Sequence, residues 1–173
     1  VMTDPADVVR VTGDFVMASL NEHNGMLNSG TMYIGGDFSR IEYDSAENFR
    51  AGKGHKVVFN GSGGQSIAVG RRGNPGFANL VFANGSMEGI TITDDYVTVT
   101  GELTNEDSVI TGYVNLDSSA VIAGDQYRGN LRFNADYTLR KDLHISGNAA
   151  ISSKVDLRGN RLEVEGNTTI WNT

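Results

Sequence analysis

The chain of 173 residues contains no cysteine and only 2 prolines. The absence of cysteine excludes disulfide bridges and thiolate metal sites. It does not identify the compartment, because many exported bacterial proteins also avoid this residue. The scarcity of proline excludes a proline-rich linker and a collagen-like helix as the source of the 22 glycines.

Long apolar runs and clusters of basic side chains are missing as well. No stretch approaches the roughly 20 apolar residues that a membrane helix needs, so we expect no membrane insertion. The net charge is −7, and adjacent basic residues occur only as the isolated pairs Arg71-Arg72 and Arg140-Lys141. Because nucleic-acid binding needs basic patches that replace phosphate counterions, we expect no nucleic-acid partner.

The residues that are abundant indicate many turns between short strands. Glycine and asparagine are frequent, and apolar residues alternate with polar ones, which is the period of a β-strand. A motif recurs in which two apolar residues, separated by one position, precede a glycine and then Asp, Glu, Asn or Ser. The motif glycines and the residues that follow them are Gly13-Asp14, Gly36-Asp37, Gly61-Ser62, Gly85-Ser86, Gly101-Glu102, Gly124-Asp125, Gly147-Asn148 and Gly166-Asn167.

These glycines recur at a nearly regular spacing. The interval from Gly13 to Gly36 is repeated from Gly101 to Gly124 and again from Gly124 to Gly147. Such a period suits a β-solenoid, in which every coil stacks on the last about 4.8 Å away. We therefore predict an all-β fold, a right-handed parallel β-helix of about eight coils that forms a single domain over residues 1–173. An antiparallel β-sandwich is the alternative, since it also has many short strands at regular spacing.

Several longer stretches carry a resemblance to a known class of segment. They are GTMYIGGDF at 30–38, GKGHKVVFNGSGGQSI at 52–67, FANLVFANGSMEGITI at 77–92, VTVTGELT at 97–104 and VDLRGNRLEVEGN at 155–167. Together they resemble repetitive, adhesin-like β-solenoid segments of large exported or surface proteins of bacteria. The resemblance implies a structural segment that is secreted or held at the cell surface, and it supplies no catalytic residues.

The residues after the motif glycines form the candidate site. If the coils stack in register, these residues make one column, with Asp14 beside Asp37 and Glu102 beside Asp125. Two carboxylates about 5 Å apart repel each other by roughly 1 kcal/mol in water. The column therefore faces solvent, where Asp and Asn hold the turns through backbone hydrogen bonds, or it binds a cation such as Ca²⁺. The Asn and Ser members of the column favour the turn interpretation.

Motifs that carry catalysis are absent from the sequence. The histidines His23, His55 and His144 have no partner at metal-ligand spacing. The stretch GSGGQS at 61–66 lacks the pattern of a nucleophile elbow and that of a phosphate loop, so it reads as a turn between coils. We therefore predict that the protein is not an enzyme.

Basic residues near acidic loops leave one enzymatic alternative open. In a polysaccharide-cleaving site, Arg71, Arg72 or Lys141 could be the basic catalytic residue, but nothing in the sequence fixes the geometry of these side chains. We accordingly predict no catalytic residues and no cofactor. Only Ca²⁺ at the acidic column stays open.

The C-terminal residues Ile170 and Trp171 are apolar and no polar cap follows them. A solenoid end normally needs a cap, so we expect the native chain to continue or this end to pack on another copy. The function we expect is that of a non-enzymatic structural or adhesive segment of a secreted or cell-surface bacterial protein. Its partners would be the rest of its own longer chain and cell-surface glycans or proteins. The alternatives are a polysaccharide-binding or polysaccharide-cleaving module and a self-assembling filament module.

Overall fold

Parallel strands that wind around a common axis make up the fold. The computed structural model describes residues 1–41, 48–70 and 76–171, and within these ranges it contains strands and turns but no helix. Every strand pair in the described ranges is parallel. The predicted β-solenoid is therefore confirmed, and the antiparallel sandwich is excluded.

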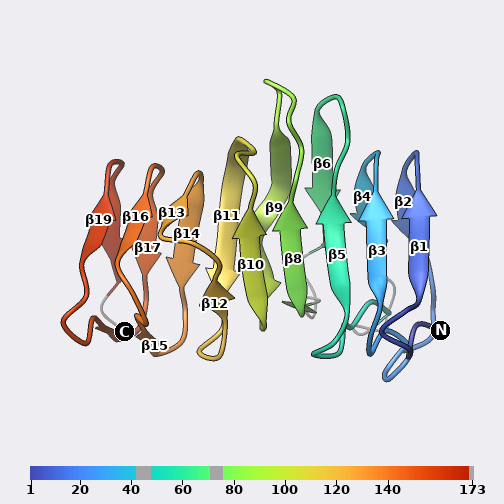
Figure 1. Cartoon of the computed structure of the whole chain (residues 1–173), viewed down its shortest axis with the longest axis horizontal. Helices are drawn as coiled ribbons and strands as arrows, with labels where there is room; N and C mark the ends of the chain where they lie inside the picture. Colours follow the sequence, from blue (N-terminus) through green and yellow to red (C-terminus); the bar gives the residue numbers. More distant parts are fainter. Residues whose placement is uncertain (42–47, 71–75, 172–173) are drawn as a thin grey trace.

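One long sheet lies at the front of the solenoid (Figure 1). Its strands in spatial order are β1 (Val8–Val11), β3 (Thr31–Ile34), β5 (Lys56–Phe59), β8 (Asn79–Phe82), β10 (Glu102–Asn105) and β12 (Val121–Ile122). A shorter sheet continues this side of the molecule toward the C-terminal end. It consists of β13 (Gln126–Tyr127), β16 (Leu143–Ile145) and β19 (Leu162–Val164).

A second long sheet lies behind the first. Its main path is β2 (Phe15–Met17), β4 (Phe38–Arg40), β6 (Gln65–Ala68), β9 (Ile90–Val99), β11 (Ile110–Leu116), β14 (Asn130–Phe133), β17 (Ala149–Ile151) and β20 (Thr168–Ile170). The short strand β7 (Gly76–Phe77) pairs with β9 beside this path. Near the C-terminal end, β15 (Tyr137–Thr138) and β18 (Val155–Asp156) pair with each other on a third side.

The path of the chain is a right-handed superhelix. It rises along each front strand, turns at the top of Figure 1 and descends along a rear strand while it advances from the N-terminal to the C-terminal end. Each rear strand of the main path is hydrogen-bonded to the rear strand of the next coil, and the described residues make about seven turns. We call the turn that leads from a front strand to the following rear strand the upper corner of a coil.

The coils shorten along the chain. Near the N-terminal end, Val8 pairs with Thr31, and Phe38 pairs with Ile67. Near the C-terminal end, Leu131 pairs with Ala149, so one turn of the solenoid there takes fewer residues than either of the earlier turns. A fixed sequence period therefore does not place residues at a fixed position around the coil.

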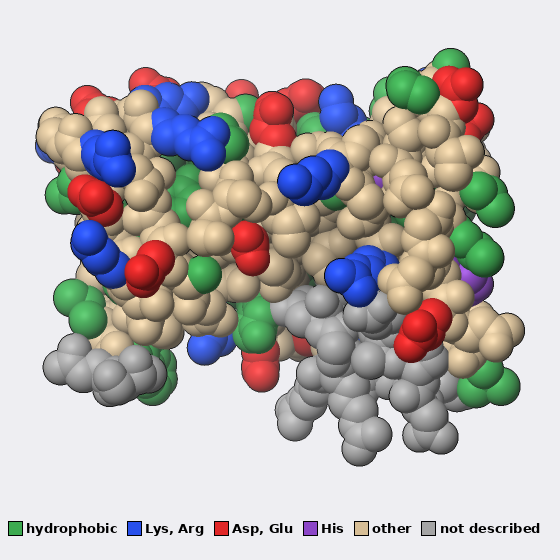
Figure 2. Space-filling view, turned by 90° about the horizontal axis from the view of Figure 1, so that it is seen from below, with side chains coloured by type: hydrophobic (Ala, Val, Ile, Leu, Met, Phe, Trp, Pro, Cys, Tyr) green, Lys and Arg blue, Asp and Glu red, His purple; other side chains and the backbone are tan. Residues whose placement is uncertain are grey.

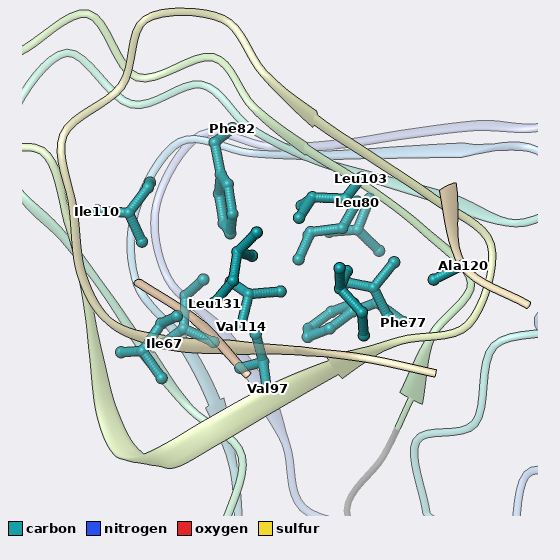
Figure 3. Packing of buried hydrophobic residues seen from close by; sticks show 14 of the residues in the cluster. Ile67, Phe77, Leu80, Phe82, Val97, Leu103, Ile110, Val114, Ala120 and Leu131 are labelled. Atoms are coloured by element: carbon teal, nitrogen blue, oxygen red, sulfur yellow. The ribbon is translucent and has the colours of Figure 1, made fainter. Parts of the chain in front are cut away.

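Apolar side chains from both sheets fill the interior of each coil. Figure 3 shows Leu80 and Leu103 from the front sheet close to Val97 and Val114 from the rear sheet. All four are fully buried, and the register stacks Leu80 against Leu103 and Val97 against Val114. Burial of each such side chain contributes about 1.5–3 kcal/mol, so these internal columns are the main source of stability.

The wide N-terminal coils have an aromatic core. The centre of the Phe38 ring lies 5.5 Å from that of Phe15, 5.1 Å from that of Phe49 and 5.5 Å from that of Phe77. Protein interiors are close-packed, so a larger cross-section needs larger side chains. In the narrower C-terminal coils small residues such as Ala149 also belong to the core.

Candidate functional site

Asp14 and Asp37, the first two residues of the predicted acidic column, lie together at the upper corner. The backbone N–H of Asp37 donates to Oδ1 of Asp14 at 2.8 Å, and the backbone N–H of Ser66 donates to Oδ1 of Asp37 at 2.7 Å. Each carboxylate thus binds the backbone of the following coil, whereas a simple Asx turn binds a residue two positions on. This geometry supports a turn-stabilising role for these two side chains.

Glu102 and Asp125 do not lie beside each other, which corrects the predicted column. Glu102 begins β10, at the opposite end of the front strand from the upper corner, and it pairs with Val121. Asp125 lies in the exposed segment between β12 and β13. Glu102 is misplaced because the motif residues before it, Val97 and Val99, lie on the rear strand β9, so their glycine leads into a front strand. Asp125 is misplaced because extra residues after β12 move the upper corner of that coil on to Gly129 and Asn130. The structure therefore brings together two of the four predicted carboxylates.

A ladder of asparagines continues the upper corner toward the C-terminal end. Oδ1 of Asn130 accepts the N–H of Asn148 at 2.7 Å, and Oδ1 of Asn148 accepts the N–H of Asn167 at 2.8 Å. A Cβ atom on Gly147 would overlap the backbone of Gly129, so this corner requires glycine. The glycine motif predicts Asn148 and Asn167 in this column but does not include Asn130. The signal that identifies it is the Gly-Asn pair, which recurs in each of the next two coils.

Three buried polar side chains connect coils inside the upper corner, and we call Gln65, Asn84 and Ser108 the buried corner cluster. Their exposed fractions are 4%, 0% and 0%. Oε1 of Gln65 accepts hydrogen bonds from the N–H of Gly61 at 2.8 Å and from Nδ2 of Asn84 at 3.0 Å, while its Nε2 donates to the oxygen of Gly36 at 2.6 Å. Oγ of Ser108 accepts the N–H of Asn84 at 2.8 Å. These bonds tie four successive coils together.

The three histidines lie apart from one another. Nε2 of His144 lies 3.1 Å from Oε1 of Glu165, and Nδ1 of His23 lies 2.7 Å from the oxygen of Asn48. His55 is fully buried, neither of its ring nitrogens has a hydrogen-bond partner among the described residues, and burial lowers its pKa to about 4. Over the described ranges, no group of three or more His, Asp or Glu side chains is arranged to hold a metal ion.

The basic residues considered for a cleaving site are only partly placed. Lys141 is exposed on the segment between β15 and β16. Arg71 and Arg72 lie outside the described residues. The described residues therefore do not test the polysaccharide-cleaving alternative.

A surface hollow of about 300 Å³ lies on the N-terminal coils beside the upper corner. We call it the Arg10 hollow, and its lining residues are Arg10, Val11, Thr12, Tyr33, Gly35, Asn60, Gly61 and Ser62. Arg10 and Tyr33 are paired on β1 and β3, and the guanidinium carbon lies 4.1 Å from the centre of the tyrosine ring. A Cβ atom on Gly61 would lie 2.5 Å from the oxygen of Gly35 and 2.6 Å from Cδ of the buried Gln65, so glycine lets these two coils approach closely below the hollow.

The remaining surface and the comparisons add little to this picture. On the underside of the solenoid, acidic and basic side chains are interspersed over the surface that the described residues form (Figure 2). In the same part of the chain, no helix has the length and hydrophobicity needed to cross a bilayer.

No protein-family model matches the chain, and no curated protein or solved structure matches it either. The secreted or cell-surface location accordingly stays a prediction.

Proposed function

We propose that the chain is a non-enzymatic structural and adhesive segment of a secreted or cell-surface bacterial protein. In this role a stiff solenoid holds other parts of a longer chain at a distance and displays its own surface to partners outside the cell. The partners we propose are the rest of that chain and glycans or proteins of a cell surface.

The observation that carries the proposal is the way side-chain oxygens tie each coil to the next. Asp14 binds the backbone of the following coil, and Asn148 does so near the other end. Gln65 bridges several coils in the interior. These bonds add to the parallel backbone ladders, so a coil can leave the stack only if several hydrogen bonds break together. That coupling is what a load-resistant spacer needs.

Single-molecule force spectroscopy tests this proposal. The whole chain is placed between reference domains of known unfolding force and pulled from its ends. We expect resolvable unfolding peaks at forces comparable with those of the reference domains. A chain that extends without a resolvable force peak would contradict the structural role.

A matched pair of variants shows whether the corner oxygens cause the resistance. The double substitution Asp14→Ala and Asp37→Ala removes two acceptors for the next coil, and we expect it to lower the force of the first peak. Asp95→Ala removes an exposed carboxylate of β9 and serves as the control with unchanged forces. Equal forces in both variants would show that the corner bonds are not the source of the resistance.

A further inference from the structure

We propose that the Arg10 hollow binds a carboxylate-bearing sugar unit, such as a uronic acid residue of an acidic glycan. This inference rests on the proposed adhesive function, because it names the ligand class that such a surface recognises. The hollow is formed by side chains of three successive coils, which meet only in the folded solenoid.

Charge selects the acidic group of the ligand. The guanidinium of Arg10 is the one ionic group among the described residues that line the hollow, and no carboxylate of these residues lines it. No carboxylate of the described residues forms an ion pair with this guanidinium. A guanidinium has a rigid fork of donors that matches the two oxygens of a carboxylate. In a chain with a net charge of −7, an exposed arginine with no acidic partner in the described part marks this spot as suited to an anion.

The other side chains suit the rest of a sugar. Tyr33 is half-buried and its ring stacks against the guanidinium of Arg10, so it holds this cationic donor in position at the hollow. The amide of Asn60 and the hydroxyls of Thr12 and Ser62 supply both donors and acceptors for sugar hydroxyls. A simple inorganic anion would leave most of these neutral polar groups without a hydrogen-bond partner. The lining therefore favours a polyhydroxylated acid.

The size of the hollow limits how much of a glycan it holds. Its volume of about 300 Å³ is at the lower end of the range for ligand pockets. It therefore accommodates a single sugar unit, and the rest of the chain lies over neighbouring surface. Such a site binds weakly alone, and repeated units of a polymer would raise the apparent affinity.

A second arginine that stacks on a tyrosine lies outside the Arg10 hollow and provides a control for the pair Arg10 and Tyr33. Arg132 lies over the ring of Tyr96, with 4.9 Å between the guanidinium carbon and the ring centre. Its Nε donates to Oδ1 of Asn134 at 2.8 Å, so this guanidinium already has a polar partner. Arg132→Gln removes a cation from a similar pair outside the Arg10 hollow.

The experiment is a titration of the whole chain, monitored by backbone amide NMR shifts and by calorimetry, with an oligomer of glucuronic acid and a glucose oligomer of equal length. We expect the acidic oligomer to bind at least tenfold more tightly than the neutral one, with shifts centred on the hollow. Arg10→Gln should lower the affinity at least tenfold, and Asn60→Ala severalfold. Arg132→Gln should leave it unchanged.

Several outcomes would overturn the proposal. They are no binding of the acidic oligomer, shifts centred on another surface, equal losses in Arg10→Gln and Arg132→Gln, or a poly-glutamate peptide that binds as tightly as the sugar acid. Arg10 is exposed on the first coil, and unchanged circular dichroism of Arg10→Gln shows that the fold is intact. Failure here leaves the spacer function standing, because pulling forces measure that function independently of ligand binding.

Discussion

Replacement of Gln65 by leucine tests whether the buried corner cluster holds the coils together. The leucine side chain has nearly the same volume but cannot form a hydrogen bond, so the substitution removes polar contacts with little change in packing. It deletes the bonds of Gln65 to the N–H of Gly61 and to the oxygens of Ile34 and Gly36, and also the bond from Asn84.

The expected magnitude follows from which partners lose their hydrogen bond. The oxygen of Ile34 still accepts the N–H of Asn60 at 3.1 Å, and Nδ2 of Asn84 still donates to the oxygen of Gly63 at 2.8 Å. The loss therefore falls on the N–H of Gly61 and the oxygen of Gly36. The N–H of Gly61 is buried, and a buried polar group without a partner costs about 1–3 kcal/mol, whereas the oxygen of Gly36 is only partly buried and can bind water. We therefore expect a destabilisation of about 2 kcal/mol.

The assay is equilibrium unfolding in urea, monitored by far-UV circular dichroism. Gln126→Leu is the control, since Gln126 is exposed and its side chain makes a single, exposed hydrogen bond within the described residues, to Nδ1 of His144 at 2.6 Å, so the free energy of unfolding should change by no more than about 0.5 kcal/mol. A loss below about 1 kcal/mol for Gln65→Leu would refute the reasoning, because it would mean that water or rearrangement replaces the buried bonds.

Three further predictions concern single residues. Gly147→Ala should destabilise the fold by more than about 2 kcal/mol in urea unfolding, because its Cβ would overlap backbone, whereas Gly13→Ala has open space and should be neutral; equal effects would contradict the corner packing. Burial lowers the pKa of His55 from 6.5 to about 4, so between these pH values the unfolded chain binds a proton that the folded chain does not. The free energy of unfolding should therefore fall by about 3 kcal/mol as the pH is lowered from 6.5 to 4. His55→Leu should remove that part of the pH dependence, and an unchanged profile would show that His55 is not its source. Tyr127→Phe removes a buried hydroxyl that has no hydrogen-bond partner among the described residues, so the melting temperature should stay the same or rise, and a clear fall would reveal an unseen partner.

The strand content and the parallel stacking could be predicted from the sequence. Alternating apolar residues before a glycine define a strand and a corner, and the first two copies of the motif have the spacing of a real coil. Val9 pairs with Met32 and Val11 with Ile34, as the motif requires. Met32 and Ile34 lie in the core, as a strand period of two requires, whereas Val9 on the first coil is 38% exposed.

The position of the later corners could not be predicted from glycine spacing alone. Ile122 stacks on Leu103 and not on Val99, which has the same place in the preceding copy of the motif. Several residues then precede Tyr127, and the corner falls at Gly129 instead of Gly124. Inserted turns are rich in Gly and Asp for the same conformational reasons as true corners. A motif based on residue types therefore cannot distinguish a true corner from an inserted turn. For this reason only two of the four carboxylates predicted to form a column lie together.

The Arg10 hollow lay beyond sequence reasoning for a related reason. Arg10, Tyr33 and Asn60 are far apart in the sequence, each on a different coil. None of these residues belongs to a recognisable motif, and they meet only because the register of β1, β3 and β5 is fixed by the core. The geometry of a solenoid surface depends on coil length more than on local sequence.

The most direct test of the account measures how distance grows along the stack. The chain has no native cysteine, so spin labels can be attached at introduced cysteines in Val8→Cys/Glu102→Cys and Val8→Cys/Val121→Cys. These positions lie in one register column, four and five coils apart. At about 4.8 Å per coil, pulsed EPR should give distances of about 19 and 24 Å between backbones, each with a narrow distribution. Equal distances, or a shorter one for Val121, would contradict the stacked parallel solenoid.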